Sequence, residues 1–152
     1  MEDIEAIKKL KCKYARCLDS KDWDQMAECF TEDAVVDYSG GQFHYEGVKA
    51  ILQFLKENLG SFDRITSHQM SQPEIEFASS TMARGIWAMR DYVIDKVLNI
   101  AVSGAAFYDD QYVKVGGQWK IKSTGYTRIF EEIGSRAGLT LTAVKEYGPP
   151  RT

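Results

Sequence analysis

The sequence predicts an α+β domain in which N-terminal helices pack in a strongly curved antiparallel sheet. Apolar residues recur at helical spacing up to Gly60, and beyond it they recur with a period of two. Turn signals separate the alternating stretches, and Gly116-Gly117 is the strongest of them. Helices that come first and long strands that follow are typical of a domain whose helices cover one face of a sheet.

Three helices are expected in the first part of the chain. The first runs from about Asp3 to Asp19, and its apolar stripe consists of Ile4, Ile7, Leu10, Tyr14, Ala15 and Leu18. A second, short helix begins near Ser20, which can cap it, and its apolar face consists of Trp23, Met26, Ala27 and Phe30. The third helix spans about Gly47 to Leu59 and ends at Gly60, which is placed as a C-terminal cap.

The remaining segments read as strands. Gly40-Gly41 turns a short strand over residues 35–38 back into residues 43–45. Longer strands are expected at 65–77, interrupted near Pro73, and then at 81–94, 100–113 and 118–130. Long antiparallel strands can curl around the helices as a cone with one open mouth, which is a natural pocket for a small apolar ligand.

The chain of 152 residues has the length of a single domain, spanning residues 1–152. Its net charge of −3 lacks the basic footprint of a nucleic-acid-binding protein. No stretch approaches the roughly 20 apolar residues that cross a bilayer, and the first residues do not resemble a signal peptide. The three cysteines lack zinc-site spacing, and there is no glycine-rich phosphate loop. We therefore expect a cytoplasmic protein with reduced thiols and with no metal or cofactor.

Asp19 and His68 are the first candidates for chemistry. Asp19 ends the first helix, and His68 is one of only two histidines in the chain. An aspartate that contacts a histidine fixes the tautomer of the ring and raises its basicity, which makes a general base. The pattern by itself favours a simpler interpretation, in which the aspartate is solvated and the histidine lies on the surface.

The order of elements resembles the SnoaL-like branch of the NTF2-like, cystatin-like superfamily, which includes scytalone dehydratase, ketosteroid isomerase and lindane dehydrochlorinase. Two blocks, residues 3–19 and 104–129, are most similar to bile-acid 7α-dehydratases, and the resemblance covers roughly residues 3–132. The first block contains both Tyr14 and Asp19, which favours the catalytic interpretation. The segment between Ile94 and Ile100 is shorter than in the bile-acid enzymes and lacks a tyrosine found near it there.

This resemblance implies a site made of Tyr14, Asp19, Tyr38, His68, Asp91 and Arg128. His68 would remove a carbon-bound proton, and Asp19 would orient it. Tyr14 and Tyr38 would donate hydrogen bonds to a substrate oxygen, although a buried tyrosine can equally satisfy only its own hydroxyl.

Asp91 and Arg128 have further interpretations. Asp91 alternates with Trp87, Met89 and Val93, so it would face an apolar interior, keep its proton and act as an acid. The alternative for Asp91 is a surface ion pair with Arg90 or Arg84. Strict alternation from Trp119 places Arg128 on the solvent side, unless a bulge marked by Gly125 switches the faces.

The resulting hypothesis is a cofactor-independent lyase that eliminates water from a hydroxylated carbonyl compound. The resemblance implies an apolar polycyclic substrate such as a steroid or bile-acid derivative, including coenzyme A thioesters. The alternatives are an isomerase of the ketosteroid-isomerase type and a non-catalytic ligand-binding module. We also expect a homo-oligomer, which the resemblance indicates is a trimer, and a tail at residues 131–152 that packs on the body or on a neighbouring subunit.

Overall fold

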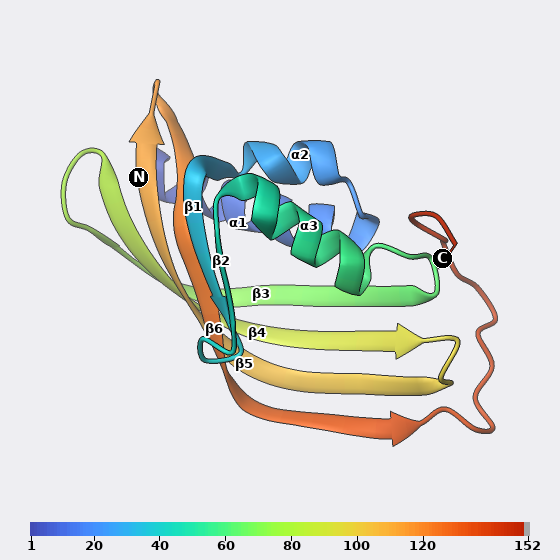
Figure 1. Cartoon of the computed structure of the whole chain (residues 1–152). Coiled ribbons are helices and arrows are strands. Elements are labelled where there is room, and N and C mark those ends of the chain that lie inside the picture. The colour runs from blue at the N-terminus through green and yellow to red at the C-terminus, as the bar shows by residue number, and fades with distance from the viewer. Residues whose placement is uncertain (151–152) are drawn as a thin grey trace.

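A computed structural model describes residues 1–150 of the chain. In these residues three helices precede or interrupt a single six-stranded sheet, in the order β2-β1-β6-β5-β4-β3. The helices are α1 (Glu2–Ser20), α2 (Trp23–Glu28) and α3 (Val48–Leu59). The strands are β1 (Phe30–Tyr38), β2 (Phe43–Glu46), β3 (Arg64–Phe77), β4 (Met82–Asp95), β5 (Ile100–Val115) and β6 (Gln118–Ser135). Figure 1 shows the helices on one side of the sheet, whose long strands bend around them. The predicted α+β class is confirmed.

The sheet is mixed rather than wholly antiparallel, which corrects the expectation from the sequence. Strand β1 runs parallel to β6, with Val35 opposite Ser123 and Val36 opposite Thr124. The β1–β2, β3–β4, β4–β5 and β5–β6 pairs are all antiparallel. Short turns impose the antiparallel direction on strands that follow one another, whereas β1 meets β6 only after most of the chain has intervened.

The first two helices are separated by Lys21, which ends α1 in the left-handed conformation at φ 54°. The cap of α2 is Asp22, whose side chain accepts a hydrogen bond from the Gln25 backbone N–H, and not Ser20. Ser20 belongs to α1 and donates its hydroxyl to the Arg16 carbonyl. Helix α2 ends at Glu28, so Phe30 begins β1 instead of continuing the helical face.

Pro73 lies within β3 and does not end it. The pairing with β4 shifts between Ser71 and Glu74, and Gln72 has a φ of 50°. A bulge of this kind accommodates proline, and β3 lies at the edge of the sheet, where a missing N–H is tolerated. The bulge therefore lets β3 run on for its full length.

The end of the chain is tied back to the body. Strand β6 continues to Ser135, five residues beyond the expected end at Phe130. In Figure 1 the segment that follows passes the ends of the long strands and returns to the loop after α3. The Phe62 backbone N–H donates to the Pro149 carbonyl at 2.9 Å, and Lys96 binds Glu146 at 3.0 Å.

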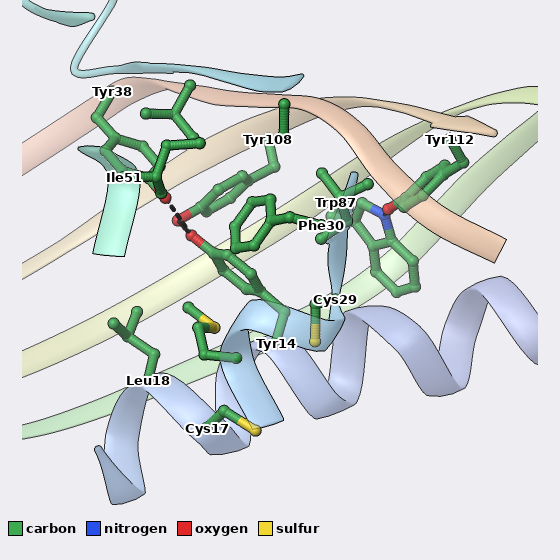
Figure 2. Packing of buried hydrophobic residues seen from close by; sticks show 14 of the residues in the cluster. Tyr14, Cys17, Leu18, Cys29, Phe30, Tyr38, Ile51, Trp87, Tyr108 and Tyr112 are labelled. Carbon is green, nitrogen blue, oxygen red and sulfur yellow. Dashed lines mark hydrogen bonds between the residues drawn. The ribbon is translucent and has the colours of Figure 1, made fainter. Parts of the chain in front are cut away.

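The main core lies between the helices and the sheet. Figure 2 shows Tyr14 of α1 among Phe30, Tyr38 and Tyr108, and the Trp87 ring beside Tyr112. These side chains are all at most 5% exposed. No helix in residues 1–150 is long and apolar enough to cross a membrane.

Candidate functional site

Asp19 and His68 lie in contact where the last turn of α1 meets β3. The Nδ1 atom of His68 is 2.7 Å from Oδ1 of Asp19, and the imidazole side chain is 8% exposed. The expected hydrogen bond between these two residues is therefore present in the structure. Among residues 1–150, the hydrogen bonding of the His68 ring involves Nδ1 alone.

Strand β3 holds the Asp19 carboxylate by three hydrogen bonds. Besides the imidazole, the His68 backbone N–H donates to Oδ2 at 2.8 Å, and the Thr66 hydroxyl donates to Oδ1 at 2.9 Å. A carboxylate fixed in this way accepts the Nδ1 proton and leaves Nε2 unprotonated in the neutral ring. This is the tautomer that a general base requires.

A row of residues crosses the sheet beside the dyad. Asp91 on β4 is directly opposite His68, and Gly104 on β5 is directly opposite Asp91. Arg128 of β6 reaches over Gly104 and donates from Nη1 and Nη2 to the two Asp91 oxygens, at 2.6 and 2.9 Å. A Cβ atom at Gly104 would lie only 2.7 Å from Nη1 of Arg128, so the glycine makes room for the arginine.

Asp91 is paired with Arg128, a partner that the sequence pattern does not indicate. A guanidinium that donates two parallel hydrogen bonds matches an ionised carboxylate and favours it over the protonated acid. The carboxylate in turn raises the pKa of Arg128. Asp91 is buried as predicted, and its ion-pair partner is Arg128 instead of Arg84 or Arg90.

A bulge does bring Arg128 to the helix side of the sheet, but it lies at Lys122 and not at Gly125. Ile121 is opposite Tyr112 and Ser123 is opposite Gln111, so that Lys122 is the extra residue. An extra residue reverses the faces of the residues that follow it as far as the next bulge, which lies at Ile129. Arg128 consequently shares the inner face with Trp119.

Three tyrosine hydroxyls meet in the core. The hydroxyl of Tyr14 lies 2.8 Å from that of Tyr38 and 3.5 Å from that of Tyr108, as Figure 2 shows. Burial raises the pKa of each of these hydroxyls, so all three keep their protons. Tyr14 and Tyr38 were expected near each other from the resemblance. Tyr108 was not, although it alternates with Ala106 on an apolar face.

A buried ion pair next to the tyrosines was also missed. The Lys11 ammonium lies 2.7 Å from Oδ2 of Asp110, and both side chains are completely buried. The Tyr112 and Thr124 hydroxyls donate to Asp110 at 2.6 and 2.5 Å. The sequence carried a signal, because Lys11 falls four residues after Ile7 within the apolar stripe of α1.

Other titratable residues lie elsewhere. His44 contacts Asp37 at 2.6 Å and Glu46 at 3.1 Å on the exposed β1–β2 hairpin. Cys12 is exposed on α1, whereas Cys17 and Cys29 are buried free thiols. Among the residues that the structure describes, no cluster of three or more His, Cys, Asp or Glu side chains is arranged to hold a metal ion.

Comparison with known proteins identifies the family of this chain. Residues 1–125 match the SnoaL-like domain. The chain belongs to the SnoaL-like family. Related sequences include uncharacterized proteins of Mycobacterium bovis and Mycobacterium tuberculosis, which are 23% identical to this SnoaL-like chain over 136 residues, covering 88% of it and 90% of each relative.

Solved structures share the fold. A proposed scytalone dehydratase from Novosphingobium aromaticivorans is 28% identical, with a TM-score of 0.79 over 97% of this SnoaL-like chain and 92% of that chain. A type 2 hexachlorocyclohexane dehydrochlorinase (LinA) is 19% identical, with a TM-score of 0.83 over 94% and 96% of the two chains. A Nostoc punctiforme protein of cystatin-like fold is 21% identical, with a TM-score of 0.68 over 83% and 90%. The expected NTF2-like, cystatin-like fold is thereby confirmed.

Proposed function

We propose that the protein is a cofactor-independent lyase, a dehydratase that removes water from a hydroxylated carbonyl compound. The observation that carries the proposal is the Asp19–His68 contact of 2.7 Å, which leaves Nε2 of His68 free beside a buried row of charged residues. The family membership supports it, since a dehydratase and a dehydrochlorinase, both named for eliminations, have the same fold.

His68 begins the reaction as a base. Its Nε2 takes a proton from the carbon next to the substrate carbonyl, and the electron pair of that C–H bond moves toward the carbonyl oxygen. Asp19 stabilises the imidazolium that forms and keeps the ring in place. The C–O bond of the hydroxyl then breaks, and the leaving oxygen takes a proton to depart as water.

The tyrosine cluster and Arg128 supply the remaining groups. A hydroxyl that keeps its proton can donate to the developing oxyanion, and Tyr14 would exchange its bond with Tyr38 for one with the substrate. Arg128, held by Asp91, presents a fixed positive charge on the same face as His68. Because both Asp91 oxygens accept hydrogen bonds from Arg128, the imidazolium of His68 is the proton donor for the departing hydroxyl, so that one histidine acts as base and then as acid.

The substrate class follows from the resemblance rather than from the geometry. We propose an apolar polycyclic ketone such as a steroid or bile-acid derivative, either free or as a coenzyme A thioester. Met89 and Trp87, which are buried on the inner face of β4, give that face an apolar part that suits such a compound.

An isomerase is the second candidate, and one observation favours it. The Asp91–Arg128 pair leaves no carboxylic acid opposite His68 to protonate a leaving hydroxyl. A reaction that only moves a proton and a double bond needs the same base and no such acid.

The two reactions are separated by incubating the protein in D₂O with hydroxylated polycyclic ketones and following the products by mass spectrometry. A dehydratase gives a product lighter by one water. An isomerase gives a product with the mass of the substrate that has gained deuterium at carbon. If the protein binds the ketones but causes neither change in mass, both the dehydratase and the isomerase hypotheses are contradicted. The protein would then be a ligand-binding module.

A further inference from the structure

A small cavity lies beside Asp19 at the open end of the sheet. Its volume is about 260 Å³, and it is enclosed by the end of α1, the start of β3 and the returning tail. Four of its lining side chains are cationic and two are aromatic, namely Arg16, Lys21, Arg64 and Lys145, and Phe62 and Tyr147.

The positive charge in this cavity is not balanced by the protein. Among the described residues that line the cavity, Asp19 alone has a carboxylate, and it already accepts three hydrogen bonds from β3. Arg64 is paired with Asp95 at 2.9 Å. Within residues 1–150, neither Arg16, Lys21 nor Lys145 forms an ion pair with a carboxylate.

Lys21 is the most buried of these cations. It is only 8% exposed, and its ammonium donates a single hydrogen bond, to the Arg64 carbonyl at 2.6 Å. The left-handed turn that ends α1 fixes its backbone there, and burial lowers its pKa while the Asp19 charge opposes that effect. An ammonium has three donors, and a buried cation without an anion is costly.

We propose that this cavity binds an oxyanion, a carboxylate or a phosphate, carried by the outer end of the substrate. Lys21, Arg16 and Lys145 would bind the anion, with Phe62 and Tyr147 flanking it. At about 260 Å³ the cavity is smaller than the roughly 300–1,000 Å³ of sites that hold a whole drug-sized molecule, so it suits a terminal group. Asp19 belongs both to the cavity and to the dyad, and this shared residue links the anion site to the substrate. That link rests on the proposed function, whereas anion binding itself does not depend on it.

The test is titration of the full chain with inorganic phosphate and with acetate, by calorimetry, at an ionic strength held constant with sodium chloride. Saturable binding is expected, and Lys21→Met should weaken it about tenfold or more, the effect of losing a charged hydrogen bond. Lys145→Ala, on the exposed tail, should weaken it without affecting folding. The matched control is Lys49→Ala, which removes an equal charge from the exposed face of α3.

Tighter binding of phosphate indicates a phosphorylated substrate, and tighter binding of acetate indicates a carboxylate. Binding of neither anion, or an equal loss in Lys49→Ala, would overturn the proposal. The variant His68→Ala keeps the two hypotheses apart: it should bind the anion as the wild type does, even though the dyad is gone. If the wild-type protein turns over substrate but binds neither anion, the anion-site proposal is wrong and the lyase proposal stands.

Discussion

At the scale of single residues, the contacts of His44 with two carboxylates predict how its imidazole titrates. Hydrogen bonds to Asp37, and then to Glu46, raise the pKa of His44 above its ordinary value of 6.5. A group whose pKa is higher in the folded state stabilises the fold fully below its unfolded value, and this contribution is lost as the pH rises through the folded value. NMR titration should place His44 above 6.5, and in His44→Gln this pH dependence of stability should vanish. A midpoint at or below 6.5 would contradict the contacts.

The cysteines provide a second residue-scale prediction. Burial raises the pKa of the Cys29 thiol to about 11, and it raises that of Cys17 as well, while Cys12 is exposed. Because the thiolate is the reactive form, Cys12 should react with a thiol reagent at neutral pH while Cys17 and Cys29 remain protected. Mass spectrometry of the labelled protein checks this, with the urea-unfolded chain as the control in which all three react. Early labelling of Cys29 would show that α2 opens in the native state.

At the scale of elements, Gly104 determines whether β6 can reach β4. A side chain there would meet the Phe130 carbonyl at 2.6 Å and the Arg128 guanidinium at 2.7 Å. Gly104→Ala should therefore displace Arg128 from Asp91, lower the free energy of unfolding by about 1–3 kcal/mol and reduce activity. Urea denaturation is the measurement. Gly134→Ala is the matched control, because a Cβ on that β6 residue meets nothing within 4 Å. If the two variants lost equal free energy of unfolding, the space at Gly104 would not be what allows Arg128 to reach Asp91.

The elements that could be predicted from the sequence are those that local pattern determines. The stripe of α1 and the turn at Gly116-Gly117 each depend on neighbouring residues, and both are present in the structure. The parallel β1–β6 pair and the bulge at Lys122 depend on partners distant in the chain, which periodicity does not identify. The cap at Asp22 was missed because Ser20 has the same chemistry two residues earlier.

The same distinction between local pattern and distant partners applies to the candidate site. Residue type and spacing singled out Asp19 and His68, but only the resemblance indicated that they meet. Alternation placed Asp91 inside correctly, yet it could not show that Arg128 would cross Gly104 and pair with the Asp91 carboxylate. Lys11 and Asp110 were overlooked because a charge within an apolar stripe is read as an exception unless its partner, far along the chain, is known.

At the scale of the whole molecule, the outer face of the sheet should be a subunit interface. Tyr92, Phe107 and Phe130 point away from the helices and are 42%, 52% and 40% exposed. Beside Phe107 lies a hollow of about 750 Å³ that Arg84 and Asp109 also line. Large apolar groups exposed on one face of a sheet are typical of subunit contacts, and we expect a homo-oligomer, as the resemblance to trimeric enzymes predicts. Light scattering at micromolar concentration should give a trimer, and Phe107→Lys should dissociate it; a wild-type monomer would refute this expectation.

The central claim is that His68, oriented by Asp19, performs the chemistry, and the most direct measurement is the turnover number of His68→Ala. Removing a general base should lower turnover by about 10²–10⁴-fold while the fold persists, and Asp19→Asn should lower it through the loss of imidazole orientation. His44→Ala, which removes the chain's other histidine from an exposed hairpin, should retain wild-type turnover. A His68→Ala protein that is folded and as active as the wild type would contradict the account.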